Sequence, residues 1–258
     1  MIGAVWQSAV VFVAGFVAGM INSVAGGGTL LSFPALVWIG RDPIVANVTN
    51  TLSLWPGSLG AMVGFRREIG DARLWMARLT APSVLGGLVG AMLLLQTPSR
   101  TFAAIVPYLI LFATLLFAAQ EPLTRWLRPA DAGAATPAEP SGWVGPVLFQ
   151  FLVAVYGGYF GAGIGILMLA ALGLLGLTDI HQMNGLKNFF AMCINLIAAF
   201  YFVFWGPVSW PDALVMATGA MAGGFGGAGL GRRLGRRFVR RAVVVIGVGM
   251  AVSLLFRR

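Results

Sequence analysis

Long apolar stretches, separated by short polar ones, follow one another along almost the whole chain of 258 residues. A helix that crosses a membrane needs about 20 mainly apolar residues, and most of these stretches approach that length. The pattern therefore predicts ten helical membrane segments. Their expected ranges are 4–25, 28–40, 44–65, 79–96, 101–119, 143–160, 163–177, 186–206, 213–230 and 242–256.

Two of the segments, 28–40 and 163–177, are too short to cross a membrane as ordinary helices. At these lengths a helix covers about 20–22 Å, whereas the hydrocarbon core of a bilayer is about 30 Å thick. We expect both to be broken or re-entrant elements. The predicted fold class is an all-α polytopic membrane protein with about eight full-length and two short or re-entrant segments.

Composition supports the membrane class and excludes two others. Apolar residues make up 59% of the chain and charged residues 10%, whereas a soluble domain carries about 25% charged residues. Disorder requires low hydrophobicity, so a disordered chain is excluded as well. The 36 glycines suit membrane helices, which pack closely through small residues.

The chain divides into two similar halves around one long polar stretch. We predict a first membrane repeat at 1–120, a cytoplasmic linker at 121–142 and a second membrane repeat at 143–258. Residues 86–91 match 223–228, and we interpret both as helix-packing glycines. At an offset of 138 positions, five further pairs share a residue type: Gly19 and Gly157, Gly27 and Gly165, Leu31 and Leu169, Leu36 and Leu174, Asn50 and Asn188.

Positive charge indicates how the two halves are oriented. Four arginines lie in the loop 66–78, and its counterpart, 204–216, holds no Lys or Arg. Conversely, the loop 97–100 holds one arginine, and its counterpart lies in the arginine-rich run 232–241. Since cytoplasmic loops collect Lys and Arg, equivalent loops should face opposite sides, as in inverted-topology repeats. The net charge of +9 is read as this topology signal and not as nucleic-acid binding.

Catalytic and metal-binding chemistry finds little support in the sequence. All eight carboxylates fall in loops or at segment ends, so no buried ladder can relay protons through the membrane. His181 is the only histidine and Cys193 the only cysteine, which excludes a histidine metal site and an internal disulfide. We expect neither an enzyme nor a cofactor or metal.

Glycine runs and polar residues interrupt the apolar segments at matching places in the two halves. A helix that restarts after such a break points its positive dipole end into the membrane, where it can bind an anion. Paired interruptions of this kind mark transporter binding sites, although close packing through small residues explains the glycines equally well. The predicted substrate-binding residues are Asn22, Gly26, Gly27, Gly28, Thr49, Asn50, Gly161, Gly163, Gly165, Lys187 and Asn188.

Lys187 is the only lysine of the protein. A lysine within a membrane helix indicates a functional site by default, but near the interface it could instead extend to the headgroups. Asn184 and Asn188 flank it on one helical face, which favours a polar cavity. Asn50 and Asn188 could each donate to an oxyanion or join two helices by a hydrogen bond.

In these stretches the chain resembles a known family. The run Gly15–Leu30, then Phe33–Leu36 and Ala46–Asn50, is similar to the opening of TauE/SafE-type anion permeases, and Gly161–Gly165 with Gly185–Asn188 resembles their second repeat. The resemblance implies export of sulfite and sulfonate compounds across the bacterial inner membrane. The family's first repeat often reads Thr-Asn-Lys, whereas this chain has Thr49-Asn50-Thr51, so one of two possible lysines is missing.

We therefore expect a multi-pass inner-membrane protein that acts as a secondary transporter, exporting a small oxyanion such as sulfite or an organosulfonate. A passive anion channel, a carboxylate transporter and a non-transporting membrane assembly subunit stay open as alternatives. The expected partners are the small anion and membrane lipids, with no nucleic acid. A homodimer is also open, because glycine-rich faces could serve either a dimer or the protein's own core.

Overall fold

The computed structural model describes residues 2–24, 27–64, 73–126, 142–175, 177, 179–234 and 236–256. Within these ranges the chain is all-helical and forms ten α-helices. They are α1 (Ile2–Val24), α2 (Thr29–Trp38), α3 (Pro43–Gly64), α4 (Arg73–Gln96), α5 (Ser99–Trp126), α6 (Val144–Tyr159), α7 (Ile164–Leu174), α8 (Ile180–Trp205), α9 (Trp210–Leu234) and α10 (Arg236–Phe256).

Each of the ten predicted segments coincides with one helix. The clearest differences lie at helix ends, since α4 begins at Arg73 instead of 79 and α5 continues to Trp126 instead of 119. Hydropathy marks only the lipid-facing part of a helix, whereas backbone hydrogen bonding continues into the polar flanks. In the described part of the chain, four helical stretches are long and apolar enough to cross a membrane: Val5–Asn22, Arg73–Gln96, Ser99–Gln120 and Gln182–Trp205.

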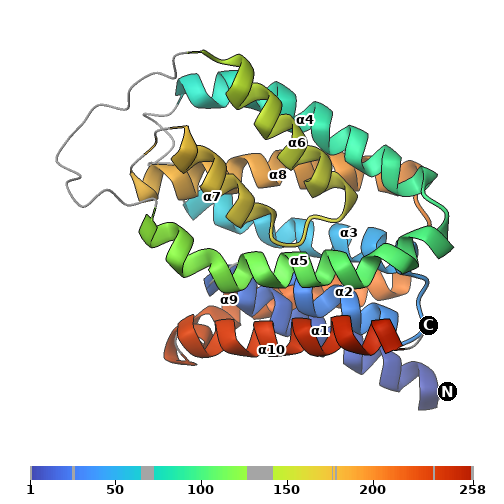
Figure 1. The fold of residues 1–258 in the computed structure, drawn as a ribbon. Coiled ribbons are helices and arrows are strands. Elements are labelled where there is room, and N and C mark those ends of the chain that lie inside the picture. Colours follow the sequence, from blue (N-terminus) through green and yellow to red (C-terminus); the bar gives the residue numbers. More distant parts are fainter. Residues whose placement is uncertain are drawn as a thin grey trace.

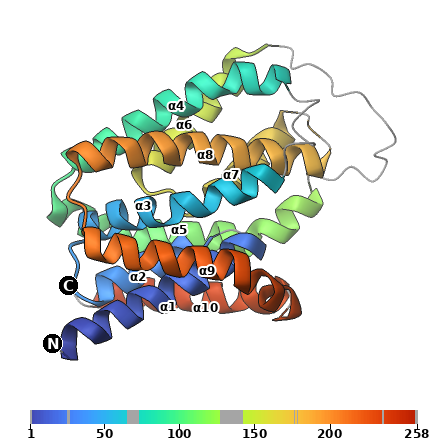
Figure 2. The ribbon, with the colours of Figure 1, turned by 180° about the vertical axis from the view of Figure 1, so that it is seen from behind.

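The helices lie side by side with their long axes roughly parallel (Figures 1 and 2). On one side α4, α6 and α8 form a layer, and on the other α1, α9 and α10 form a second layer, with α3 and α5 between them. Both chain termini lie at the same end of the bundle. The short helices α2 and α7 are placed in the interior of this arrangement, next to α5.

Glycines bring two helix pairs into close contact. Helix α1 packs against α9, and α4 packs against α6. A Cβ atom on Gly86 would lie 2.5 Å from the carbonyl oxygen of Phe151, and one on Gly223 would collide with the carbonyl of Phe16. These contacts confirm that the glycines of 86–91, and Gly223 in the matching run, serve helix packing.

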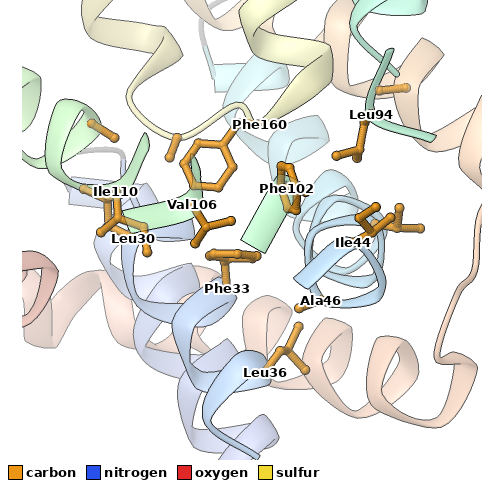
Figure 3. Close-up of a cluster of buried hydrophobic side chains, with 14 of the residues drawn as sticks. Leu30, Phe33, Leu36, Ile44, Ala46, Leu94, Phe102, Val106, Ile110 and Phe160 are labelled. Atoms are coloured by element: carbon orange, nitrogen blue, oxygen red, sulfur yellow. The ribbon is translucent and has the colours of Figure 1, made fainter. Parts of the chain in front are cut away.

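An aromatic cluster fills the interior between the short helices. Phe33 of α2 meets Phe160, the residue after α6, with ring centroids 5.3 Å apart, and Phe102 of α5 lies 6.4 Å from Phe160 (Figure 3). Each of the three phenylalanines is at most 2% exposed. The cluster joins residues from both halves of the chain, and it holds the segments around α2 and α7 together.

Candidate substrate site at the two helix breaks

The first helix break lies between α1 and α2. Gly27 has a φ of 93°, in the left-handed region that side chains disfavour. The N–H of Gly28 donates to the side-chain oxygen of Asn22 over 2.7 Å, and a Cβ on Gly28 would collide with the carbonyl of Ala18. The predicted residues Asn22, Gly27 and Gly28 thus form one turn, while Gly26 lies outside the described residues.

The second helix break lies between α6 and α7. Gly161 and Gly163 have φ values of 75° and 78°, so both require the conformational freedom of glycine. The hydroxyl of Tyr156 donates to the carbonyl of Ala162 over 2.6 Å and so fixes the turn. Helix α7 then begins at Ile164.

The two breaks meet the same part of α5. A Cβ atom on Gly27 would lie 2.7 Å from the ring of Phe117, and one on Gly163 would lie 3.5 Å from the Cα atom of Ala113. Ala113 and Phe117 are one helical turn apart, near the middle of α5. Glycine turns that are far apart in the sequence are therefore neighbours in the fold.

One turn of α3 also contacts both breaks. At one end of this turn, the side-chain nitrogen of Asn47 donates to the carbonyl of Tyr159, the last residue of α6, over 2.9 Å. At the other end, Asn50, which is 2% exposed, accepts a hydrogen bond from Ser32 of α2. Asn50 uses its oxygen in this bond, so its amide N–H groups are the part that can serve a ligand.

Thr49 occupies a different environment from Asn50. Its hydroxyl oxygen accepts a hydrogen bond from the backbone N–H of Ser209 over 3.1 Å, so it ties α3 to the connection between α8 and α9. The contact involves neither helix break. Of the two predicted residues on α3, Asn50 forms a side-chain hydrogen bond with a short helix, whereas the Thr49 hydroxyl bonds to Ser209.

Lys187 lies beside the first turn of α7. A Cβ on Gly165 would lie 3.3 Å from the Lys187 Cδ atom, and the ammonium group donates to the side-chain oxygen of Asn184 over 3.1 Å. The methylene chain therefore follows the start of α7, and Asn188 is half-buried at the next position of α8. Since α7 begins at the second break, the structure brings the lysine and a helix N-terminus together.

Two further polar groups stand out among the described side chains. The side-chain oxygen of Asn47 and the indole N–H of Trp55 are buried and find no hydrogen-bond partner among those residues. Both belong to α3. Asn47 falls within the polar stretch that opens the third predicted segment, but no sequence signal distinguishes Trp55. Buried polar groups without partners are rare and call for an explanation.

The residue before Trp55 packs near the first break. The preceding residue, Leu54, packs in one cluster with Ala18 of α1, and Ala18 is the residue that Gly28 abuts. Among the described residues, no three His, Cys, Asp or Glu side chains are grouped so as to hold a metal ion. The side chains at the breaks offer hydrogen-bond donors, one unpaired amide oxygen that can accept a hydrogen bond, and one positive charge.

An all-helical bundle with two glycine breaks in its interior is the architecture of a polytopic membrane transporter. A family model described as "Sulfite exporter TauE/SafE" matches residues 11–254, and the chain belongs to this family. The family is one of membrane transporters, and the apolar helices are consistent with a multi-pass location in a bacterial inner membrane.

Named relatives are similar over nearly their full length. A "Probable membrane transporter protein" of Haemophilus influenzae is 29% identical over 257 residues, covering 96% of this chain and 94% of that protein. "Probable membrane transporter protein ORF9" of Sinorhizobium sp is 27% identical, covering 96% and 92%. "Probable membrane transporter protein YfcA" of Escherichia coli is 26% identical, covering 96% and 89%. No solved structure matches the chain.

Proposed function

We propose that this protein is a secondary transporter that exports a small oxyanion, sulfite or an organosulfonate, across the bacterial inner membrane. The observation that carries the proposal is that Lys187 lies beside the first turn of α7, at the second break. The first break contacts the same turn of α5 as the second. A cation and the positive end of a helix favour the same ligand, an anion. The expected site residues are those predicted from the sequence, with Asn50 and Lys187 as the main side-chain donors.

The packing of the helices supports two repeats related by a twofold axis. Exchanging each helix with the one five places away in the order, so that α1 swaps with α6 and α4 swaps with α9, converts one packing pair into another. The pair α1 and α9 becomes α6 and α4, and the pair α3 and α9 becomes α8 and α4. The same operation converts α2 with α10 into α7 with α5. Two repeats related by a twofold axis in the membrane plane would produce this exchange. The repeat boundaries 1–120 and 143–258, joined by the cytoplasmic linker 121–142, are part of the proposal.

In this scheme six helices cross, in place of the eight full-length segments predicted from the sequence, because α1, although long enough to cross, is counted with α2 in a re-entrant pair. Each repeat then contributes three crossing helices and one such pair. Helices α3, α4 and α5 would cross in the first repeat and α8, α9 and α10 in the second, while α1–α2 and α6–α7 would enter from opposite sides. An odd number of crossings per repeat is what inverts the second copy. Alternating access would then arise as one repeat rocks against the other around the two breaks.

Helix starts suggest a revised match between the repeats. Helices α3 and α8, α4 and α9, and α5 and α10 each begin 137 positions apart. With this offset Asn50 corresponds to Lys187 and Asn47 to Asn184, in place of the earlier match of Asn50 with Asn188. The first repeat would thus hold the neutral amide of Asn50 where the second holds the lysine, one position before Thr51, where the family pattern has its lysine. The site would contain one positive charge.

Trp55 supplies a further donor for an anion. Its indole N–H is buried without a partner among the described residues, and the preceding residue, Leu54, packs with Ala18, which Gly28 abuts. Leaving a buried donor unpaired costs about 1–3 kcal/mol. An oxyanion at the first break would remove this penalty, which favours anion binding over an empty site.

The test is sulfite flux in proteoliposomes containing purified wild-type, Lys187→Ala or Arg100→Ala protein. Arg100 is exposed at the start of α5, so it controls for the loss of a positive charge elsewhere. A charge-assisted hydrogen bond of about 1.5–3 kcal/mol corresponds to about a 10–100-fold loss of affinity in Lys187→Ala. Arg100→Ala should retain wild-type affinity.

Undiminished affinity in Lys187→Ala would remove the lysine from the site. Conductance without saturation would indicate a passive channel instead of a transporter. A folded wild-type protein that moves no sulfite or sulfonate would contradict the proposed substrate class.

A further inference from the structure

Asn47 is the most completely buried polar side chain with an unpaired atom in the described part of the chain. It is 1% exposed, and its side-chain oxygen has no hydrogen-bond partner among the described residues. The orientation of its amide group is fixed by chemistry. The atom that it faces at 2.9 Å is the carbonyl oxygen of Tyr159, which can only accept, so the nitrogen must point there and the oxygen away.

The position of Asn47 places its amide group beside the proposed site. Tyr159 ends α6 and directly precedes the second break, while Asn50, one turn further along α3, contacts α2 after the first break. Asn47 therefore lies on the turn of α3 that touches both breaks. It also lies in the half of the molecule that has no lysine.

The corresponding residue of the second repeat shows what the oxygen lacks. With the 137-position offset Asn47 corresponds to Asn184, whose side-chain oxygen accepts a hydrogen bond from Lys187. In the first repeat the lysine position is occupied by Asn50, whose oxygen is engaged by Ser32. The protein thus supplies a donor to Asn184 and none, among the described residues, to Asn47.

We propose that the side-chain oxygen of Asn47 accepts a hydrogen bond from the transported anion itself. This inference rests on the proposed function and narrows its substrate class. The preferred substrate carries an O–H or N–H donor in addition to its anionic group. Lys187 and the helix termini bind the anionic group, and Asn47 selects for the donor.

The substrate preference is tested with two sulfonates of equal size. Propane-1-sulfonate and 2-hydroxyethanesulfonate have the same number of heavy atoms and the same charge, but only the second carries a hydroxyl donor. In proteoliposomes containing the full-length wild-type protein, we expect the hydroxyl compound to have a KM about tenfold lower, the effect of one hydrogen bond to a buried acceptor. Equal KM values, as expected if a fixed water satisfies Asn47, would overturn the inference.

Two variants assign the preference to Asn47. Asn47→Leu replaces the amide by an apolar side chain of similar size and should reverse the order, so that propane-1-sulfonate is preferred. If the leucine side chain disturbs folding, Asn47→Ala is the alternative variant, and it should abolish the preference. Thr51→Val is the matched control, because among the described residues the Thr51 hydroxyl bonds to the backbone of its own helix at Asn47. This variant should keep the wild-type ratio. A wild-type ratio in both Asn47 variants would overturn the assignment.

This experiment separates the inference from the proposed function. Saturable transport of both sulfonates with no preference contradicts the role of Asn47 and leaves the anion transporter intact. Transport of neither sulfonate, and none of sulfite, contradicts both. Because Lys187→Ala should weaken both sulfonates equally, a change in their ratio reports on Asn47 and not on the charge.

Discussion

The two helix breaks share a backbone plan and differ in chemistry. Each places a glycine of positive φ before a short helix, and each lies against the middle of α5. At the first break two side chains are engaged internally, since Asn22 caps Gly28 and Ser32 bonds to Asn50, and the polar groups of α3 left without a partner among the described residues are neutral. The second carries the only lysine of the chain. In the proposed mechanism, the two similar breaks would provide the symmetry for alternating access, while Lys187 of the second repeat alone would provide the charge that binds the substrate.

Internal hydrogen bonds explain why a helix N-terminus alone would make a weak site here. The N–H groups of Gly28, Leu30 and Leu31 all bond within the first break, to Asn22, Gly27 and Gly28 respectively. A helix start exposes at most four unpaired N–H groups, so few are left for a ligand. Side chains such as Lys187 must therefore supply most of the binding energy.

The largest expected effect comes from moving the charge between the breaks. Lys187→Asn should lower the kcat/KM of transport about 100-fold, the upper range for losing a charge-assisted hydrogen bond. If the breaks are equivalent, adding Asn50→Lys to this variant should restore at least tenfold of that loss, because the lysine returns at the corresponding position. Flux in proteoliposomes measures both. No recovery in a well-folded double variant would contradict the equivalence of Asn50 and Lys187.

The second prediction concerns the backbone of the first break. Gly27→Ala adds a Cβ at positive φ and within 2.7 Å of the Phe117 ring, so it should destabilise the protein by about 2 kcal/mol. Gly40→Ala is the matched control, since Gly40 has a φ of 90° with nothing near its Cβ position, and the backbone term alone is about 1 kcal/mol. Thermal unfolding in detergent compares the two. Equal Tm shifts would show that Phe117 does not hold the break.

Sequence patterns predicted the helices well because apolar runs decide which segments enter lipid. They also found the breaks, because clustered glycines such as Gly161 and Gly163 are visible locally. They did not predict that Thr49 bonds to Ser209 or that Ser32 bonds to Asn50. Such pairs join segments whose proximity depends on the packing of the whole bundle, and hydropathy carries no information about it.

The third prediction uses a contrast between the two ends of the bundle. Arg41 binds Asp212 through two hydrogen bonds of 2.6 and 3.2 Å and joins the α2–α3 connection to α9. At an offset of 137 the equivalent positions are Thr178 and Trp75, which cannot form an ion pair. We therefore expect this pair to hold closed the end of the bundle that lies opposite the predicted cytoplasmic linker.

Asp212→Asn should open that end part of the time. The reporter is Val48→Cys in a Cys193→Ser background, because Val48 is fully buried beside Gly206. Adding Asp212→Asn should make this cysteine react about five times faster with a membrane-impermeant thiol reagent. That factor corresponds to about 1 kcal/mol from a partly exposed ion pair. Arg100→Gln, at the same end, should leave the rate unchanged. An unchanged rate in Asp212→Asn would show that the pair does not act as a latch.

The smallest effect is expected at Trp55, which tests whether the first break contacts the substrate at all. Trp55→Phe removes the unpaired N–H and keeps an aromatic ring, so it should raise KM about threefold, the lower range for one hydrogen bond. Its Tm should stay close to the wild-type value, since the lost group has no partner among the described residues. Trp205→Phe, at an exposed residue stacked on Tyr201, is the control for losing an indole. If Trp55→Phe and Trp205→Phe give the same KM, the Trp55 N–H does not bind the anion. Substrate binding would then rest on the second break, and the two breaks would differ in function as well as in charge.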